Sequence, residues 1–172
     1  MKFCVHFGAR GLAADPDSLK AIAVKAEAAG FEHFGLSDHV VVATDVASAY
    51  PYAASGKFYA QDTGVTLEQV TALAFVAAAT SRIRLLTSVM VLPHRHPVLA
   101  AKMLATVDLL SKGRLTVGVG VGWMAEEIAL LGGPDFKARG RASDEYVQAM
   151  RALWTEPAPS FQGEHVGFDG LL

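Results

Sequence analysis

Three consecutive polar residues, Ser37-Asp38-His39, end an apolar run that begins at His33. A carboxylate and an imidazole side by side can bind a ligand, orient it and move a proton near neutral pH. If the run is an interior strand, its tip is the point at which a ligand would meet both side chains. Asp38 could equally cap the following segment, with His39 as a partly buried loop imidazole. The residues themselves leave both interpretations open.

A second candidate is the run Gly118-Val119-Gly120-Val121-Gly122-Trp123. Glycines at alternate positions share one face of a strand, where missing side chains let a flat ligand approach the backbone. The amides of residues 120–123 could then meet the polar edge of such a ligand. The alternative is a flexible strand end, because glycine also marks bends. The run does not follow the first strand and is not the dinucleotide-binding fingerprint.

Two other groups receive structural interpretations. His94 and His96 have no third metal ligand at a convincing spacing, so we predict no metal site. Glu126 and Glu127 are typical of the solvated first turn of a short helix.

The loop from Ala49 to Gln61 is long for a connection between a strand and a helix. Its aromatic residues either form a wall of a substrate site or pack the loop onto the protein. These residues are Tyr50, Tyr52, Phe58 and Tyr59.

Short apolar runs alternate with helical patterns along the chain. We expect strands over residues 2–7, 33–36, 82–92 and 114–122, and helices over 18–29, 66–80, 97–113 and 141–154, followed by an irregular hairpin. Thr66 is the expected cap of the second helix, and Gly30 the stop of the first. This alternation predicts βαβ units, a parallel sheet and the α/β fold class. Counting by itself favours an open doubly wound sheet, because a (β/α)8 barrel needs about 250 residues.

The composition excludes several classes of protein. The 172 residues carry a formal net charge of −2, which gives no electrostatic reason to expect nucleic acid or a membrane surface as partner. We see no signal peptide and no apolar run of the ~20 residues that a membrane span needs, so we expect a cytoplasmic protein with one domain over 1–172. Cys4, the only cysteine, is expected to be buried and inert, and no intrachain disulfide can form.

Four segments carry a family resemblance that spans nearly the whole chain. They are "AEAAGFEHFGLSDHV", "AAATSRIRLLTSVMVLPHRHPVLAAKMLATVDLLSKGRLTVGVGVGWMAEEIALLG", "RGRASDEYVQAMRALW" and "SFQGEHVGFDG". The chain resembles the N-terminal part of the luciferase-like monooxygenase superfamily, and within it the branch of coenzyme F420-dependent oxidoreductases. The resemblance implies an α/β fold of the (β/α)8 TIM-barrel type, of which this chain carries roughly the first half.

The active site of such a barrel lies at the carboxyl ends of the strands. The resemblance places an acid and a histidine, here Asp38 and His39, against the cofactor ring and gives His39 a catalytic role. It also implies a cis peptide bond between Ser88 and Val89, in a bulge that supports the ring. The implied cofactor-binding residues are Asp38, His39, Ser88, Val89, Met90, Gly120, Val121, Gly122 and Trp123.

The function implied is hydride transfer between coenzyme F420 and a small organic substrate. An FMN-dependent monooxygenase is the main alternative, and a non-catalytic half barrel that needs a partner is the third. The glucose-6-phosphate dehydrogenase branch has an acid just after the glycines, whereas this chain has Trp123, which disfavours a sugar-phosphate substrate. Half a barrel also exposes two strand edges and an apolar interior. We therefore expect a homo-oligomer, such as a dimer, and no activity from an isolated 172-residue monomer.

Overall fold

The computed structural model describes residues 1–58 and 64–171, which fall into two compact units. Unit 1 comprises Met1–Val42, the described part of 59–90, and Thr106–Val119. Unit 2 comprises Ala43–Phe58, Val91–Ala105 and the described residues from Gly120 onward. In neither described part is any helix long and apolar enough to cross a bilayer. That residues 1–172 form a single domain stays a prediction.

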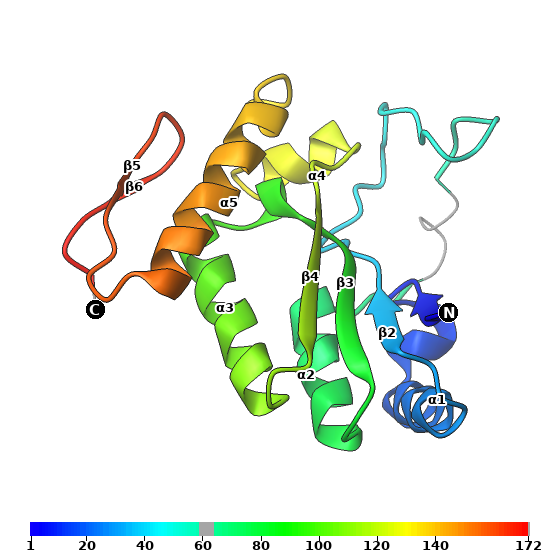
Figure 1. Ribbon diagram of the computed structural model, residues 1–172. Helices are drawn as coiled ribbons and strands as arrows, with labels where there is room; N and C mark the ends of the chain where they lie inside the picture. Colours follow the sequence, from blue (N-terminus) through cyan, green and yellow to red (C-terminus); the bar gives the residue numbers. More distant parts are fainter. Residues whose placement is uncertain (59–63, 172) are drawn as a thin grey trace. The chain divides into compact units, whose positions relative to one another are not determined.

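Every expected strand and helix is present (Figure 1). The second strand has the expected bounds, and the first, third and fourth strands are shorter than expected. The strands are β1 (Cys4–Phe7), β2 (His33–Leu36), β3 (Arg84–Val91), β4 (Leu115–Gly120) and the hairpin pair β5 (Phe161–Gln162) and β6 (Gly167–Phe168). The helices are α1 (Pro16–Ala28), α2 (Gln69–Ala79), α3 (Pro97–Leu110), α4 (Ala125–Leu130) and α5 (Arg139–Thr155), with 3-10 turns η1 (Gly11–Ala14) and η3 (Leu92–His94).

The first four strands form one sheet in the order β1-β2-β3-β4. β1 pairs with β2, and β2 with β3, in parallel, with Cys4 opposite His33 and His33 opposite Arg84. A sheet in which neighbouring strands are consecutive and parallel requires a crossover after each strand, and α1 and α2 supply the first two. The predicted α/β class with a parallel sheet is confirmed.

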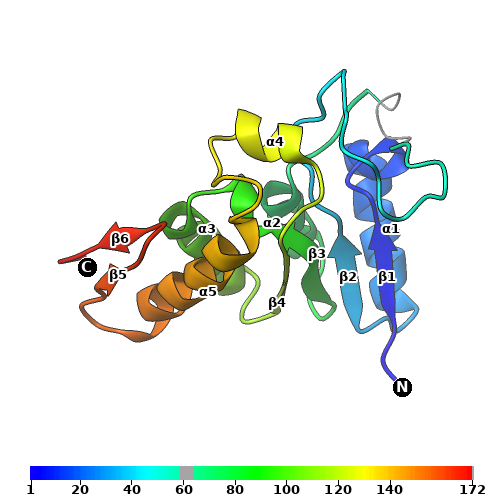
Figure 2. The same cartoon turned by 90° about the horizontal axis from the view of Figure 1, so that it is seen from above.

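The two faces of this sheet differ in burial. α1 and α2 cover one face of the sheet (Figure 2). Phe34, Leu36 and Leu85 are fully buried. Alternation along the strand puts Phe34 and Leu36 on the face opposite to that on which Gly35 meets Cys4 and His6. Cys4 and His6 project from the opposite face, here called the inner face, and both are exposed. The prediction of a buried Cys4 is therefore wrong, because alternation along β1 places its thiol on the inner face. Partial burial nevertheless raises the pKa of that thiol.

Local capping explains where the helices begin and end. The Asp15 carboxylate accepts a hydrogen bond from the Ser18 amide at 2.8 Å, and Gly30 takes a positive φ of 80° where α1 stops. The predicted cap of α2 is wrong. Glu68 caps this helix by accepting from the amides of residues 70 and 71, while Thr66 instead forms an isolated antiparallel bridge with Arg10.

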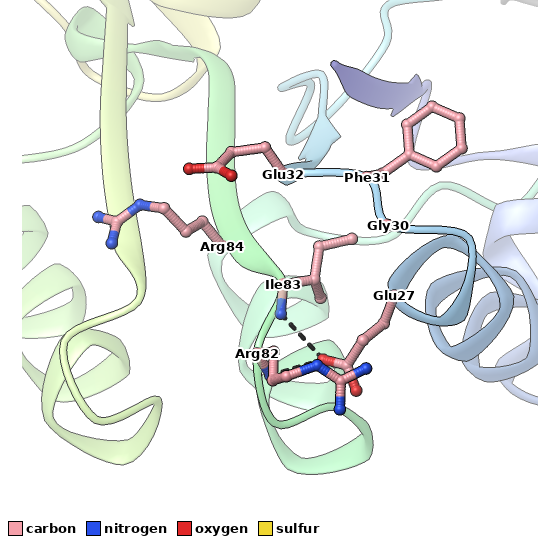
Figure 3. A pocket seen from close by; sticks show the side chains of 7 residues that line it. All are labelled: Glu27, Gly30, Phe31, Glu32, Arg82, Ile83 and Arg84. Carbon is pink, nitrogen blue, oxygen red and sulfur yellow. Dashed lines mark hydrogen bonds between the residues drawn. The ribbon is translucent and has the colours of Figure 1, made fainter. Parts of the chain in front are cut away.

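A carboxylate from α1 fastens the chain that enters β3. Glu27 Oε2 accepts from the amide of Ser81 at 2.9 Å. It also accepts from the amides of Arg82 and Ile83 at 2.6 and 2.9 Å (Figure 3). Burial raises the pKa of Glu27, but these amides and the Arg82 charge outweigh it and lower the pKa from 4.5 to about 2.

The same residues border an open cavity of about 380 Å³ at the amino ends of β2 and β3 (Figure 3). Its lining consists of Glu27, Gly30, Phe31, Glu32, Arg82, Ile83 and Arg84. The carboxyl ends of the strands, where the active site was predicted, are at the opposite end of the sheet. Residues at the amino ends of barrel strands mainly serve stability.

We predict that Glu27→Gln lowers the free energy of unfolding by roughly 1 kcal/mol at neutral pH, a value kept small because solvent screens the carboxylate. Since the folded pKa of Glu27 is depressed, its stabilisation is present above pH 4.5 and disappears as the pH falls toward 2. Urea unfolding of both proteins from pH 7 to pH 2 measures the difference. A constant gap across this range, or an equal effect of Glu156→Gln at an exposed position, would contradict the prediction.

Candidate functional site

The polar triplet lies at the carboxyl end of β2, as predicted. The Ser37 amide donates to the Phe7 carbonyl at 3.0 Å, so pairing with β1 continues one residue beyond β2. Asp38 is only 4% exposed, whereas His39 is half-buried. Both residues also have interaction partners within the chain. The structure therefore confirms where the triplet lies, while its role toward a ligand stays a prediction.

The peptide bond between Ser88 and Val89 is cis, as the resemblance implies. The Val89 side chain is 43% exposed at this end of β3. Met90 is fully buried, so it belongs to the core and offers no accessible surface to a ligand. Of the predicted bulge residues, Val89 therefore offers the most accessible apolar side chain.

Thr87 joins β3 to β4 through its side chain. Its Oγ1 donates to the Gly118 carbonyl at 2.8 Å and accepts from the Gly118 amide at 3.0 Å. A Cβ at position 118 would lie 2.6 Å from the Thr87 carbonyl oxygen, closer than real Cβ atoms come. Glycine is thus required here for the approach of two strands, whatever else the glycine run does.

Gln69, which the sequence reasoning missed, ties the ends of β2 and β3 together. Its Nε2 donates to the Leu36 carbonyl at 2.7 Å and more weakly to the Val89 carbonyl at 3.4 Å. The residue is fully buried, and Oε1 has no hydrogen-bond partner among the described residues. The available signal was a glutamine at the start of a mostly apolar helix.

His6 is a second missed residue at this end of the sheet. Its Nε2 lies 3.0 Å from the Ser88 carbonyl oxygen, although the two residues are on β1 and β3. The intervening strand contributes Gly35, whose absent Cβ would lie 3.3 Å from the His6 ring and 3.6 Å from Ser88 Cβ. The missing side chain on β2 lets the imidazole reach across it.

In unit 2 the glycine run leaves the strand earlier than predicted. β4 ends at Gly120, and Gly122 has a positive φ of 75°. A Cβ at position 122 would lie 2.7 Å from Val91 Cγ1, and the Gly122 carbonyl accepts from Arg139 Nε at 3.0 Å. Gly122 therefore does not share a strand face with the earlier glycines, because the chain turns there. Val121 is exposed beside it.

Trp123 packs against the aromatic loop within unit 2. The ring centroids of Tyr50, Phe58 and Trp123 are pairwise 5.1 Å apart, and Tyr52 contacts Tyr50 at 5.5 Å. Tilted and edge-to-face rings at such distances attract one another. The loop is thus packed as one of the two interpretations predicts, while Tyr59 lies outside the described residues.

A carboxylate fixes the start of this loop. Glu126 Oε1 accepts from the amides of Ala47 and Ser48 at 2.8 and 3.0 Å, and Ser48 Oγ accepts from the Ala125 amide at 3.1 Å. Burial raises the pKa of Glu126. Hydrogen bonds to its carboxylate, including those from Ser48 and Ala47, lower the pKa by more than burial raises it, so the net shift is downward. Glu126 lies in the first turn of α4, as predicted, but it is half-buried and not fully solvated, because its carboxylate accepts from the loop backbone.

Glu127 is also not solvated, since it is fully buried. Its Oε2 lies 3.6 Å from Nε2 of His94, which is buried as well. Buried ionisable groups are generally paired in this way. His96 is exposed, and the described residues contain no group of three or more His, Cys, Asp or Glu that could hold a metal ion.

Residues 1–171 match the family described as luciferase-like monooxygenase. The chain belongs to this family.

Two sequence relatives match 95% and 59% of this chain. An uncharacterised protein of Mycobacterium tuberculosis is 35% identical over 165 residues, which are 95% of this chain and 58% of the relative. The FMNH2-dependent dimethylsulfone monooxygenase of Pseudomonas putida is 35% identical over 104 residues, 59% of this chain and 28% of that protein.

Two solved structures also match nearly all of this chain. The monooxygenase RslO1 from Streptomyces bottropensis has a TM-score of 0.74 at 28% identity, covering 99% of this chain and 48% of that one. An F420-dependent secondary alcohol dehydrogenase, solved with an F420-acetone adduct, has a TM-score of 0.74 at 23% identity and the same coverage, which shows the fold alone. The chain thus spans about half the length of these TIM-barrel relatives, and its four strands correspond to a half barrel.

We predict that Glu126→Ala releases the aromatic loop from α4. The chain has two tryptophans, so in a Trp154→Phe background Trp123 is the only one left to report. Removing the acceptor of two amides should cost about 1–3 kcal/mol of unfolding free energy, shift Trp123 emission to the red and increase its quenching by acrylamide. Glu156→Ala, at an exposed position, is the control. Unchanged emission in the Glu126→Ala protein would show that the rings hold the loop without the carboxylate.

Proposed function

We propose that this luciferase-like protein is an oxidoreductase that transfers hydride between coenzyme F420 and a small organic substrate. The observation that carries the proposal is the exposed Val89 side chain at the carboxyl end of β3, in the same unit as the Asp38-His39 pair after β2. An apolar surface beside a carboxylate and an imidazole fits a flat ring with polar substituents.

The chemistry of the surrounding inner face supports the fit. The His6 imidazole fills the space over Gly35 and reaches the Ser88 carbonyl, so the imidazole forms the surface there. A ring with polar substituents could therefore lie against this imidazole in unit 1. The buried Asp38 carboxylate is the least accessible member of the set and would act mainly by orienting its neighbours.

The chain's own residues would each have a limited task. Val89 would support one face of the ring, and His39 would orient the reacting edge or move a proton. When bound, a deazaflavin supplies the hydride chemistry, because carbon replaces the central nitrogen of a flavin. Holding ring and substrate in one orientation is the protein's main contribution.

Relatives support both cofactors. One structural relative is F420-dependent, while the dimethylsulfone monooxygenase relative uses FMNH2. The Ser37-Asp38-His39 triplet favours F420, because the resemblance links an acid and a histidine at these positions to the deazaflavin branch. FMN-dependent monooxygenation is the second candidate function, and Trp123 still disfavours a sugar-phosphate substrate.

We predict that the protein binds coenzyme F420 at least about tenfold more tightly than FMN, a difference of about 1.4 kcal/mol. Fluorescence titration with each compound measures both dissociation constants. His39→Asn should weaken F420 binding, whereas His96→Asn, at an exposed position, should leave it unchanged. Tighter binding of FMN, with oxygen consumption by the reduced complex, would favour the monooxygenase instead.

We also propose that the chain self-associates as a homodimer. Leu109 and Leu110, adjacent at the end of α3, are 79% and 66% exposed, and surface leucines in such positions favour association. Sedimentation velocity should show a dimer that dissociates on dilution and is weakened by Leu110→Lys. Leu130→Lys, at a similarly exposed leucine of α4, is the control. A monomer at all concentrations that turns over substrate would contradict both this proposal and the expectation of inactivity.

A further inference from the structure

Strand β1 carries two exposed side chains that can take part in proton transfer, Cys4 and His6, and both lie on the inner face. Cys4 and His6 are two positions apart on β1, and both side chains approach Gly35 of β2. The imidazole is near the carboxyl end of the strand, where barrel enzymes bind their ligands. It is exposed, so a ligand can reach it.

The hydrogen bond to Ser88 fixes which ring nitrogen carries the proton. A carbonyl oxygen can only accept, so His6 Nε2, 3.0 Å away, must be the donor. In the neutral imidazole the other nitrogen, Nδ1, is then an acceptor with a free lone pair. Within the described residues, Nδ1 has no hydrogen-bond partner.

The orientation of the ring is also set by its surroundings. The imidazole lies over Gly35, where a Cβ would be 3.3 Å from the ring. Its Nε2 reaches the Ser88 carbonyl. A purely structural donor to Ser88 would need only an N–H group. An imidazole adds a fixed basic nitrogen on an exposed face, next to the residue pair Ser88-Val89.

We propose that His6 is a ligand-binding residue, whose Nδ1 accepts a hydrogen bond from an N–H or O–H group of the molecule bound on the inner face. This inference rests on the proposed function, because the ligand is the cofactor that this function requires. It assigns a contact to β1, from which the resemblance names no site residue.

The test compares two histidines of the same face. In His6→Gln the amide nitrogen can replace Nε2 and still donate to Ser88, but no acceptor remains at the place of Nδ1. His33 pairs with Cys4 at the amino end of the sheet, so His33→Gln makes the same change away from the proposed contact. Titration with F420 and with FMN, each followed by fluorescence, gives the affinities of the three proteins.

We expect His6→Gln to weaken binding of whichever cofactor the wild type binds by about three- to tenfold, and His33→Gln to change it by less than about twofold. A second measurement needs no variant. Nitrogen-15 NMR of the wild type at neutral pH should show His6 protonated at Nε2, with an Nδ1 resonance that shifts when the cofactor is added.

Three outcomes overturn the inference. Unchanged affinity in His6→Gln, with the cofactor still bound by the wild type, removes His6 from the site and leaves the proposed function intact. A neutral ring protonated at Nδ1 contradicts the acceptor role in the same way. Failure of the wild type to bind either cofactor refutes the proposed function and this inference together.

Discussion

The carboxyl end of β3 receives many of its hydrogen bonds from side chains. His6 donates to the Ser88 carbonyl, Gln69 to the Val89 carbonyl, and Thr87 exchanges two bonds with Gly118. Backbone groups that leave the regular ladder must find other partners or lose stability. These side chains come from β1, α2 and β3 itself, so the strand end depends on several elements being in place. The exposed position of Val89 follows from that arrangement.

Glycines on the neighbouring strands leave the space that these hydrogen bonds need. The His6 imidazole reaches β3 only because Gly35 has no side chain, and Thr87 approaches β4 only because position 118 has none. A glycine run at a strand end is easily interpreted as space for a ligand. Here Gly118 and Gly122 are first required by the packing of the protein against itself, with a Cβ contact below 3 Å at each position. Any ligand must use the surface that remains after this packing.

The sequence predicted the elements well, because their signals are local. Pro97 begins a helix, and Gly30 and Gly113 end helices with positive φ, each for reasons contained in a few neighbouring residues. It failed where the answer depends on which face a residue takes. Cys4 and His6 lie in an apolar run that resembles a core strand, and only the register against β2 shows that they face away from the helices.

The same limit applies to burial of charge, since Glu127 becomes buried through a contact with His94, 33 positions earlier, that no local pattern encodes.

The inner face also differs from the apolar interior that a half barrel suggests. It carries His6, Arg84 and Thr116, and Arg84 already donates to Thr116 Oγ1 and to the Leu115 carbonyl. Covering such a face with a second copy would remove polar groups from water, which is costly unless each finds a partner. Exposed Leu109 and Leu110 carry no such cost. This is why we propose association at the end of α3 and a ligand with polar groups of its own on the inner face.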